Sequence, residues 1–429
     1  MVGGKRMKRR EFVRQSFIGL SAVNAPLLLS APANARLPGT VTWGGAYILE
    51  DEPGLMLYTR QALAMTPKVS PTGESANGAL LREIRATDWS DTALDLRTGL
   101  DRTQTRYGMV FALASEQVLA TVFLEKLSTT QYILRQIGYV TIYDIFERRI
   151  VACLAVRGRY LDEKPGRPDE SLLPELFFNM LANVDQSGSI ARFMTERLTD
   201  YPFEEKYEGK YFQVEPVRYT DLARLHVEQY DIDLARYGDD IGFAVTTAFS
   251  ENLVSPILPY RKTTAVNRDM LSEMKILAMN GESPLNTALA LKPADAAIEV
   301  THRGWEFANV KTSSTRNQVA LVTSLVIRIY DKQTSETYYN QGFYARQDFN
   351  EIFEGNLGLD RKSRLFMLHE TILDRAFGAI ASEQARGILY DGEETSGASV
   401  KTFVQAEAED WDSYSAECER IRGLLPSGF

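Results

Sequence analysis

The fold is decided by one stretch in the first half of the chain, Tyr139-Val140-Thr141-Ile142-Tyr143-Asp144. A second run over residues 150–160 follows it across the charged turn Glu147-Arg148-Arg149. Both runs are rich in β-branched and aromatic residues, a composition that favours strands. Together they predict a β-hairpin.

A second hairpin is predicted over residues 321–331 and 337–346. Its first strand ends in Ile329-Tyr330-Asp331, which repeats Ile142-Tyr143-Asp144 of the first hairpin. A helix is expected before and after each hairpin. The four expected helices cover residues 115–136 (capped by Ser115), 172–182, 241–253 (capped by Asp239 or Asp240) and 365–383. This shared order predicts that one α+β unit is duplicated.

The sequence therefore predicts an α+β fold with two related helix, β-hairpin and helix modules, mixed or antiparallel sheets, and a C-terminal amphipathic helix. The expected divisions are a signal peptide (1–35), a loosely structured lead-in (36–102), a first module (103–230), a second module (231–390), and a linker with the C-terminal helix (391–429). This pattern resembles the small α/β modules of envelope assembly proteins, such as the curli secretion channel and the amino-terminal domain of the translocation protein TolB. The resemblance is one of architecture and implies no particular activity.

The N-terminus has the three parts of a secretory signal: a basic start, an uncharged segment over residues 15–35, and the small-residue site Ala33-Asn34-Ala35. Arg9, Arg10 and Phe12 resemble the twin-arginine signal of bacteria, which implies export of a folded protein to the periplasm. Residues 17–35 are too polar and too interrupted to be a stable membrane span. The alternative is a basic tail before a short buried helix.

The charge balance narrows the class of partner. Loss of residues 1–35 would remove six positive charges and one negative charge and change the formal net charge from −9 to −14. An acidic chain of this kind repels phosphate backbones, so nucleic-acid binding is not expected. With 44% hydrophobic and 24% charged residues, the chain has the make-up of a globular protein, and no membrane span is expected after the signal.

Two cysteines, Cys153 and Cys418, fall on faces that are predicted to be buried. Cys153 lies in an apolar run, and Cys418 belongs to a series with helical spacing: Trp411, Tyr414, Cys418, Ile421 and Leu425. In an oxidising compartment the two cysteines could form a disulfide, and the alternative is two free buried thiols. The series predicts a C-terminal helix over residues 400–424, which packs either on its own chain or on a partner.

One loop resembles an EF-hand calcium site. Asn183, Asp185 and Ser187 supply oxygen ligands at the right spacing, and Gly188 occupies the turn position. Met194 stands where the bidentate carboxylate belongs, so any calcium site would be weak. The alternative is an ordinary turn between two helices, and no cofactor is predicted.

Four carboxylates, Asp88, Asp91, Asp95 and Asp101, surround Trp89 and suggest either a metal or acid–base site or a solvated surface. The histidines show no zinc-ligand spacing, and His369 is expected to be structural.

No serine-hydrolase elbow, phosphate-binding loop or dinucleotide-binding turn occurs in the sequence. The interpretation is therefore a periplasmic binding or assembly component of the cell envelope, whose partner is a protein or another envelope component. The alternative is a periplasmic hydrolase with a carboxylate-based site. The sequence leaves the oligomeric state open.

Overall fold

The computed structural model describes most of the chain between residues 39 and 425. It leaves out residues 1–38, 49–55, 69, 71–72, 87–93, 98–104, 145–148, 183–187, 201–208, 231, 254, 256, 261–292, 313–315, 353–360, 384–387, 390–400, 409 and 426–429. The described residues form an α+β fold, which confirms the predicted class.

Two units follow one another along the chain. The first unit contains β1 (Gly39–Ile48), α2 (Leu57–Ala64), α3 (Ala76–Ala86), β2 (Leu94–Arg97), β3 (Thr105–Leu124), β4 (Thr129–Asp144), β5 (Arg149–Pro165), α4 (Leu173–Ala182) and α5 (Ile190–Asp200). The second unit contains β6 (Phe212–Val214), β7 (Arg218–Tyr219), α6 (Asp221–Gln229), α7 (Leu234–Leu253), β8 (Ile257–Leu258), β9 (Ala296–Thr312), β10 (Arg316–Asp331), β11 (Thr337–Ile352), α9 (Arg361–Ala381), β12 (Lys401–Ala406) and α11 (Trp411–Arg422).

Each unit builds one mixed sheet. The first sheet has the strand order β2-β1-β3-β4-β5, and the second has the order β12-β11-β10-β9-β6-β8. In both sheets the first strand of the unit pairs in parallel with two neighbours, and three long strands then continue as an antiparallel meander.

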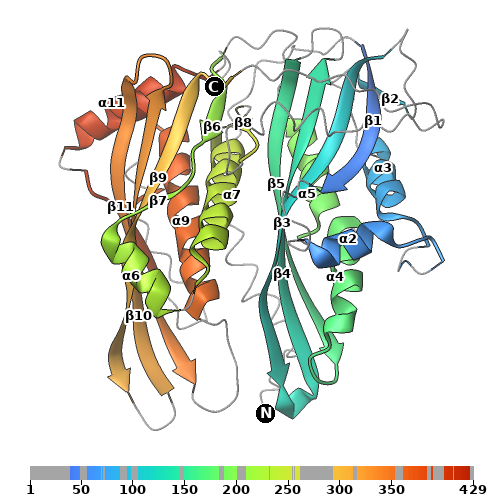
Figure 1. Ribbon diagram of the computed structural model, residues 1–429, viewed down its shortest axis with the longest axis horizontal. Coiled ribbons are helices and arrows are strands. Elements are labelled where there is room, and N and C mark those ends of the chain that lie inside the picture. The colour runs from blue at the N-terminus through green and yellow to red at the C-terminus, as the bar shows by residue number, and fades with distance from the viewer. Residues whose placement is uncertain are drawn as a thin grey trace, which may run out of the picture.

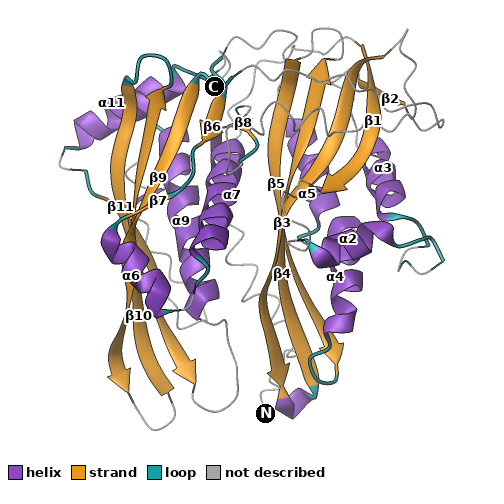
Figure 2. Cartoon of the chain, in the orientation of Figure 1, coloured by secondary structure: helices purple, strands orange, loops and turns teal. Residues whose placement is uncertain are grey.

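The two units lie side by side and form alternating layers of sheet and helix (Figures 1 and 2). Helices α2 to α5 cover one face of the first sheet, and α7 and α9 lie between the first sheet and the second. The helices of the second unit thus cover two sheets at once, their own and that of the first unit.

The two units match strand by strand. The sheet order β2-β1-β3-β4-β5 corresponds to β8-β6-β9-β10-β11, with the same parallel and antiparallel pairings. β7 pairs in parallel with β9 just beyond the part of β9 that pairs with β6. The second half of β1 pairs in parallel with β3 in the same way, beyond the first half. β12 and α11 have no counterpart among the described elements of the first unit.

The irregularities match as well. The pairing of β4 with β5 shifts at Ile142/Tyr143, and that of β10 with β11 shifts at Ile329/Tyr330. A second bulge leaves Ala114 unpaired in β3 and Arg303 unpaired in β9. Bulges interrupt the hydrogen-bond ladder at particular positions. Two bulges at corresponding positions of the two sheets therefore indicate that the units have the same strand architecture. The repeated Ile-Tyr-Asp of the sequence ends corresponding strands.

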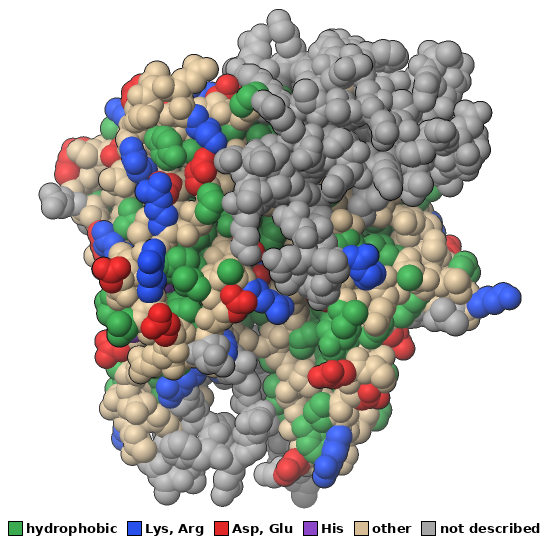
Figure 3. All heavy atoms as spheres, in the orientation of Figure 1, with side chains coloured by type: hydrophobic (Ala, Val, Ile, Leu, Met, Phe, Trp, Pro, Cys, Tyr) green, Lys and Arg blue, Asp and Glu red, His purple; other side chains and the backbone are tan. Residues whose placement is uncertain are grey.

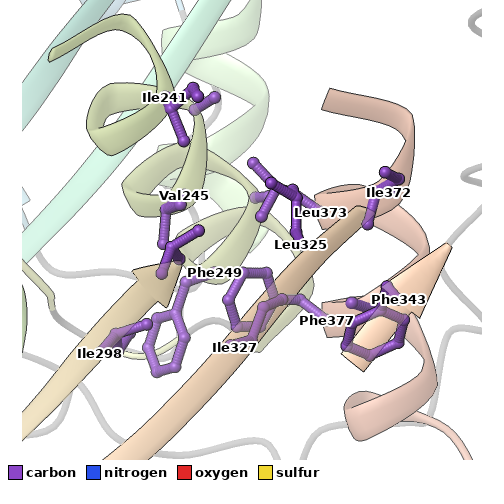
Figure 4. Close-up of a cluster of buried hydrophobic side chains, with 14 of the residues drawn as sticks. Ile241, Val245, Phe249, Ile298, Leu325, Ile327, Phe343, Ile372, Leu373 and Phe377 are labelled. Carbon is purple, nitrogen blue, oxygen red and sulfur yellow. The ribbon is translucent and has the colours of Figure 1, made fainter. Parts of the chain in front are cut away.

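The core of the second unit lies between its sheet and the helix pair (Figure 4). Phe249 of α7 and Phe377 of α9 meet edge to face, with ring centroids 5.5 Å apart. They pack over Ile298, Leu325 and Ile327 of the sheet (Figure 4). Burial of these side chains anchors the helix pair to the second sheet.

Most of the predicted elements are confirmed. β4 with β5 and β10 with β11 are the two predicted hairpins. α4, α7 and α9 are the helices expected over residues 172–182, 241–253 and 365–383. The face formed by Tyr414, Cys418, Ile421 and Leu425 is buried in the core of the second unit, so the C-terminal helix packs on its own chain.

The helix predicted over residues 115–136 is wrong. Residues 115–124 continue β3, residues 125–127 form a short turn, and the remainder begins β4. The apolar residues at helical spacing are also good strand formers, and pairing with neighbouring strands overrides the local pattern. Val118 is 39% exposed and Leu127 is 55% exposed, so these two residues do not form a buried helix face.

Two predicted helix starts also differ from the structure. α7 begins at Leu234, where the Asp233 carboxylate accepts hydrogen bonds from the amides of Ala235 and Arg236. Asp239 and Asp240 therefore lie inside the helix and do not cap it. At the C-terminus, β12 pairs with β11, and the helix starts only after Asp410, whose carboxylate caps α11.

The predicted lead-in is more ordered than expected, because it supplies β1, α2, α3 and β2. β6, β7 and α6 belong to the second sheet or pack on it, although the predicted boundary at residue 230 assigns them to the first module.

Among the described residues, no helix is long and apolar enough to cross a membrane. Figure 3 shows basic, acidic and apolar side chains intermingled over the visible surface of the second unit.

We predict that Gly188→Ala destabilises the protein strongly. Gly188 has φ +99°, and a Cβ there would collide with the backbone carbonyl of Arg159 in β5. The expected loss is about 2–4 kcal/mol, from backbone strain and overpacking, measured by urea denaturation. Gly166→Ala is the matched control, because Gly166 has φ +95° and open space around it. Equal losses in the two variants would contradict a role for close packing at Gly188.

Candidate functional site

Among the described residues, a dense group of buried charges lies where the two units meet. α9 carries two adjacent polar residues, His369 and Glu370, which are 0% and 1% exposed. Glu370 contacts the first sheet, whereas His369 contacts the second sheet. α9 is therefore held on both sides by polar contacts.

Glu370 binds three arginines of the first sheet. Arg135 lies on β4, where its Nη2 is 2.7 Å from Oε1 of Glu370. Arg157 lies on β5, where its Nη1 donates to the same oxygen over 3.1 Å. Arg159 donates to Oε2. Such charge-assisted contacts are stronger than neutral hydrogen bonds and fix the position of α9 against the sheet.

The electrostatic balance favours the charged form of Glu370. Burial alone would raise the pKa of this carboxyl, but Arg135, Arg159 and Arg157 outweigh burial and hold its pKa well below the usual range. The carboxylate is therefore ionised throughout the physiological range. A buried charge of this kind is tolerated only because its partners are buried with it.

Arg157 has two further acidic partners. Its Nη2 lies 2.8 Å from Oε2 of Glu251 on α7 and 3.2 Å from Oδ2 of Asp374 on α9. Arg197 of α5 approaches Glu251 within 3.8 Å and donates to its backbone oxygen. We call Arg135, Arg157, Arg159, Glu251, Glu370 and Asp374 the inter-unit cluster.

Arg135 is the most deeply buried member of the cluster, at 0% exposure. Its guanidinium lies over the ring of Phe366, 4.4 Å from the centroid, and donates to the amide oxygen of Gln117. Cation–π and hydrogen-bond contacts partly replace the water that the guanidinium has lost. Asp240 of α7 adds an attractive charge.

The three histidines of the chain come together in the second unit. His302 of β9 and His369 of α9 face each other with their Nε2 atoms 3.0 Å apart. Oη of Tyr237 lies 2.6 Å from Nδ1 of His369. His226 of α6 accepts a hydrogen bond from the amide of Trp305. We call His302, His369 and Tyr237 the histidine network.

Hydrogen-bond geometry assigns the tautomers in this network. The amide of Gly304 donates to Nδ1 of His302 over 2.9 Å, so His302 carries its proton on Nε2. That proton points at Nε2 of His369, which also lies 2.8 Å from Oγ1 of Thr323. With Nε2 as the acceptor, His369 carries its proton on Nδ1 and donates to Tyr237. Both rings are neutral and use both of their nitrogens.

Burial keeps the rings neutral. It lowers the pKa of His302 to about 3, with a smaller contribution from His226. It also lowers the pKa of His369 well below its usual value, with a smaller contribution from His302. The network ties α7 and α9 to β9, and its imidazoles are placed as structural polar groups, as expected for His369.

The residues of the predicted calcium loop, Asn183, Asp185 and Ser187, lie outside the described residues. Gly188 and Met194, which belong to the same pattern, are described. Gly188 lies against β5, and Met194 is fully buried in the core of the first unit. Met194 thus occupies the carboxylate position of the loop pattern with an apolar side chain that points into the core.

Three of the four clustered aspartates, Asp88, Asp91 and Asp101, lie outside the described residues, as do Arg9, Arg10 and Phe12 of the signal. The backbone of Asp95 belongs to β2. Among the residues that the structure describes, no group of three or more His, Cys, Asp or Glu side chains is arranged to hold a metal ion.

Of the two alternatives for the cysteines, the structure has the free thiols: Cys153 and Cys418 are both unbridged and buried. Cys153 contacts the hydroxyl of Thr141 at the joint between the units, whereas Cys418 lies in the core of the second unit. Burial raises the pKa of Cys153 to about 12 and that of Cys418 to about 11, so both thiols stay protonated. The apolar patterns were interpreted correctly, but burial on two separate surfaces does not bring two thiols together.

The inter-unit cluster was not predicted from the sequence, although a signal for it exists. Arg135, Arg157 and Arg159 lie next to apolar runs in their strands, and the last two are spaced to share one face. His369 and Glu370 likewise lie among the apolar residues at the centre of α9. Charged residues in buried elements require partners, but the sequence does not say which.

Comparisons with known proteins add little. No family model matches the chain, and no curated protein matches it. Similar solved structures include a lipoprotein from Neisseria meningitidis, with TM-score 0.20 and 15% identity, covering 39% of this chain and 97% of that one. They also include a neuraminyllactose-binding hemagglutinin homologue from Helicobacter pylori, with TM-score 0.22, 8% identity and coverage of 44% and 91%. A hypothetical protein from Chlamydia trachomatis has TM-score 0.19, 13% identity and coverage of 33% and 74%. At these TM-scores the likenesses carry no argument about function.

We predict that Glu370→Gln destabilises the protein by about 3–5 kcal/mol, because three buried arginines lose their shared counter-charge. Chemical denaturation measures the loss. Glu407→Gln is the control: Glu407 pairs with Arg303 at the surface, where both side chains are more than 40% exposed, so about 0–1 kcal/mol is expected. A loss at Glu370 no larger than that at Glu407 would mean that the cluster does not hold the units together.

We also predict that the histidine network makes the protein sensitive to acid. As pH falls through 6.5, the unfolded chain takes up protons on His302 and His369, whereas the folded chain does not until about pH 3 at His302. Their contribution to stability is therefore present above pH 6.5 and is lost progressively below it. His302→Asn should lower the number of protons taken up on unfolding by about one, measured from denaturation midpoints between pH 7.5 and 5.5. An unchanged pH dependence would contradict the neutral assignment of His302.

Proposed function

We propose that this protein is exported to the periplasm and acts there as a binding or assembly component of the cell envelope, with a protein or another envelope component as its partner. The observation that carries the proposal is the inter-unit cluster: the buried charges of the described residues join two like units into one body. Glu251, Glu370 and Asp374 are held by arginines and are not presented to a substrate.

Export in the folded state is consistent with this architecture. The cluster joins residues far apart in the sequence, such as Arg135 and Glu370, and long-range contacts of this kind form late in folding. A route that carries folded proteins lets the two units dock in one compartment before transport. The signal pattern at Arg9, Arg10 and Phe12 provides the address.

We propose further that the two units arose by duplication of one α+β module. Their common strand order, their two coincident bulges and the repeated Ile-Tyr-Asp support this origin. In this proposal each unit is a domain with its own sheet, and the second unit extends from about β6 to α11. A tandem arrangement suits a binding component because it offers two related surfaces on one chain.

We predict that replacing Arg9 and Arg10 together by Lys holds the protein in the cytoplasm, because the twin-arginine pair is what the transport route recognises. Immunoblots of periplasmic and cytoplasmic fractions measure the distribution.

Arg14→Lys is the matched control, since Arg14 lies outside the pair, and it should be exported normally. Export of the double variant Arg9→Lys with Arg10→Lys at the level of the control would mean that the N-terminus is not a twin-arginine signal.

A further inference from the structure

β12 is an outer strand of the second sheet. It pairs with β11 on one side, and among the described residues no strand pairs with its other side. In the first unit the corresponding outer strand is β5, where the amide of Ala155 turns away from β4 and donates to Oγ of Ser250 on α7 over 3.1 Å. β12 therefore continues the second sheet beyond the repeated strand order and ends it in an edge that no described strand covers.

The backbone of β12 presents alternate residues to this edge. The amide of Glu407 donates to the carbonyl of Gly342 on β11 over 2.8 Å, at the end of the antiparallel pairing. In an antiparallel pair, residues that exchange hydrogen bonds with one neighbour alternate with residues whose N–H and C=O groups point to the other side. Thr402, Val404 and Ala406 therefore turn their backbone donors and acceptors away from β11.

β12 lacks the features that keep edge strands from pairing with other chains. Such strands are commonly interrupted by proline, by bulges or by inward-pointing charges. β12 contains no proline, and its pairing with β11 has no register shift. Its inward side chains include Val404 and Ala406, which are buried in the core of the second unit, whereas Phe403 on the other face is 37% exposed. A regular strand of this kind is suited to the addition of another strand.

We propose that β12 is a dimerisation strand, which pairs in antiparallel fashion with β12 of a second copy of this chain and extends the second sheet through both copies. This goes beyond the proposed function, because it names a partner, and it does not depend on the export signal.

The strand is self-complementary in one register. When Val404 lies opposite Val404 of the second copy, Thr402 lies opposite Ala406 in both directions, so the outward backbone groups of the strand are all paired. The same register sets Lys401 opposite Glu407 of the second copy at each end, and opposite charges in facing positions stabilise a pair of strands. A shift along the strand leaves outward groups unpaired and separates these charges.

The pairing also agrees with the position of the helices. Facing residues of an antiparallel pair point to the same side of the sheet. α9 and α11 pack on the inner face of the second sheet within their own copy. The helices of both copies would therefore lie on one face of the extended sheet, and Phe403 of both copies would lie on the other face.

A proline at residue 402 tests the edge without removing a backbone bond from the sheet. The amide of Thr402 points away from β11, so Thr402→Pro blocks pairing with a second copy and leaves pairing with β11 in place. Thr402→Val is the matched control. Both variants lose the hydrogen bond that Gln347 donates to the Thr402 hydroxyl, but only the valine variant keeps the amide.

Sedimentation velocity of the full-length protein between roughly 1 and roughly 200 µM measures the fraction of dimer. The native chain and Thr402→Val should dimerise progressively over this range. Thr402→Pro should raise the dissociation constant at least roughly tenfold, because each copy loses one backbone donor from the contact. A native chain that stays monomeric, or equal dimerisation of the two variants, would overturn the proposal.

Charge reversal tests the register in variants that keep every backbone group. In a homodimer, Lys401→Glu places a glutamate opposite Glu407, and Glu407→Lys places a lysine opposite Lys401. Each variant alone should therefore dimerise roughly tenfold more weakly than the native chain. An equal mixture of the two variants restores opposite charges at both ends and should dimerise as the native chain does.

The mixture also controls for changes within one copy. Glu407→Lys loses its surface pair with Arg303, but this loss is the same whether the variant is alone or mixed. A mixture that associates no better than either variant alone would overturn the register and the proposal with it.

Discussion

The structure depends on the need to neutralise one buried carboxylate. Glu370 lies in a helix between two sheets, where an unpaired charge would be too costly to bury, and it reaches Arg135, Arg157 and Arg159 on neighbouring strands of the other unit. These contacts have directions as well as energies, because guanidinium and carboxylate groups are planar. They select one position of α9 along the first sheet, which an apolar contact alone would leave less well defined.

The same helix also explains the layer order. Each sheet has one face covered by the helices of its own unit, and the other face of the first sheet would be left bare without the second unit. α7 and α9 cover it, so these helices are apolar toward their own sheet and carry the acidic side chains Glu251, Glu370 and Asp374 toward the other. His369 is the exception on the inner side, and there the neutral histidine network meets its hydrogen-bonding needs without introducing a charge.

The parts of the fold that could be predicted are those set by local chemistry. The hairpin around Tyr139–Asp144 and the helix around Phe249 follow from strand composition, helical spacing and breaking residues. The strand at residues 115–124 was missed because its apolar residues also fit a helix, and only pairing with β4 decides between the two. The inter-unit cluster was missed because its partners are far apart in sequence. The sequence shows that Arg157 needs an acidic neighbour but does not identify Asp374. The Ile-Tyr-Asp repeat was a correct indication of corresponding strand ends, whereas the two shared bulges depend on register.

The matched register of the two units also shows how corresponding faces of the two sheets differ. Counting from the shared bulge, Arg135 corresponds to Val322, and Arg157 corresponds to Tyr344. The outer face of the second sheet therefore lacks the guanidinium pair that receives an acidic helix on the first sheet. At the same register Arg159 corresponds to Arg346, so only one of the three arginines that bind Glu370 has a counterpart on the second sheet. Two differences at corresponding strand positions thus distinguish the face of the first sheet that binds an acidic helix from the corresponding face of the second sheet.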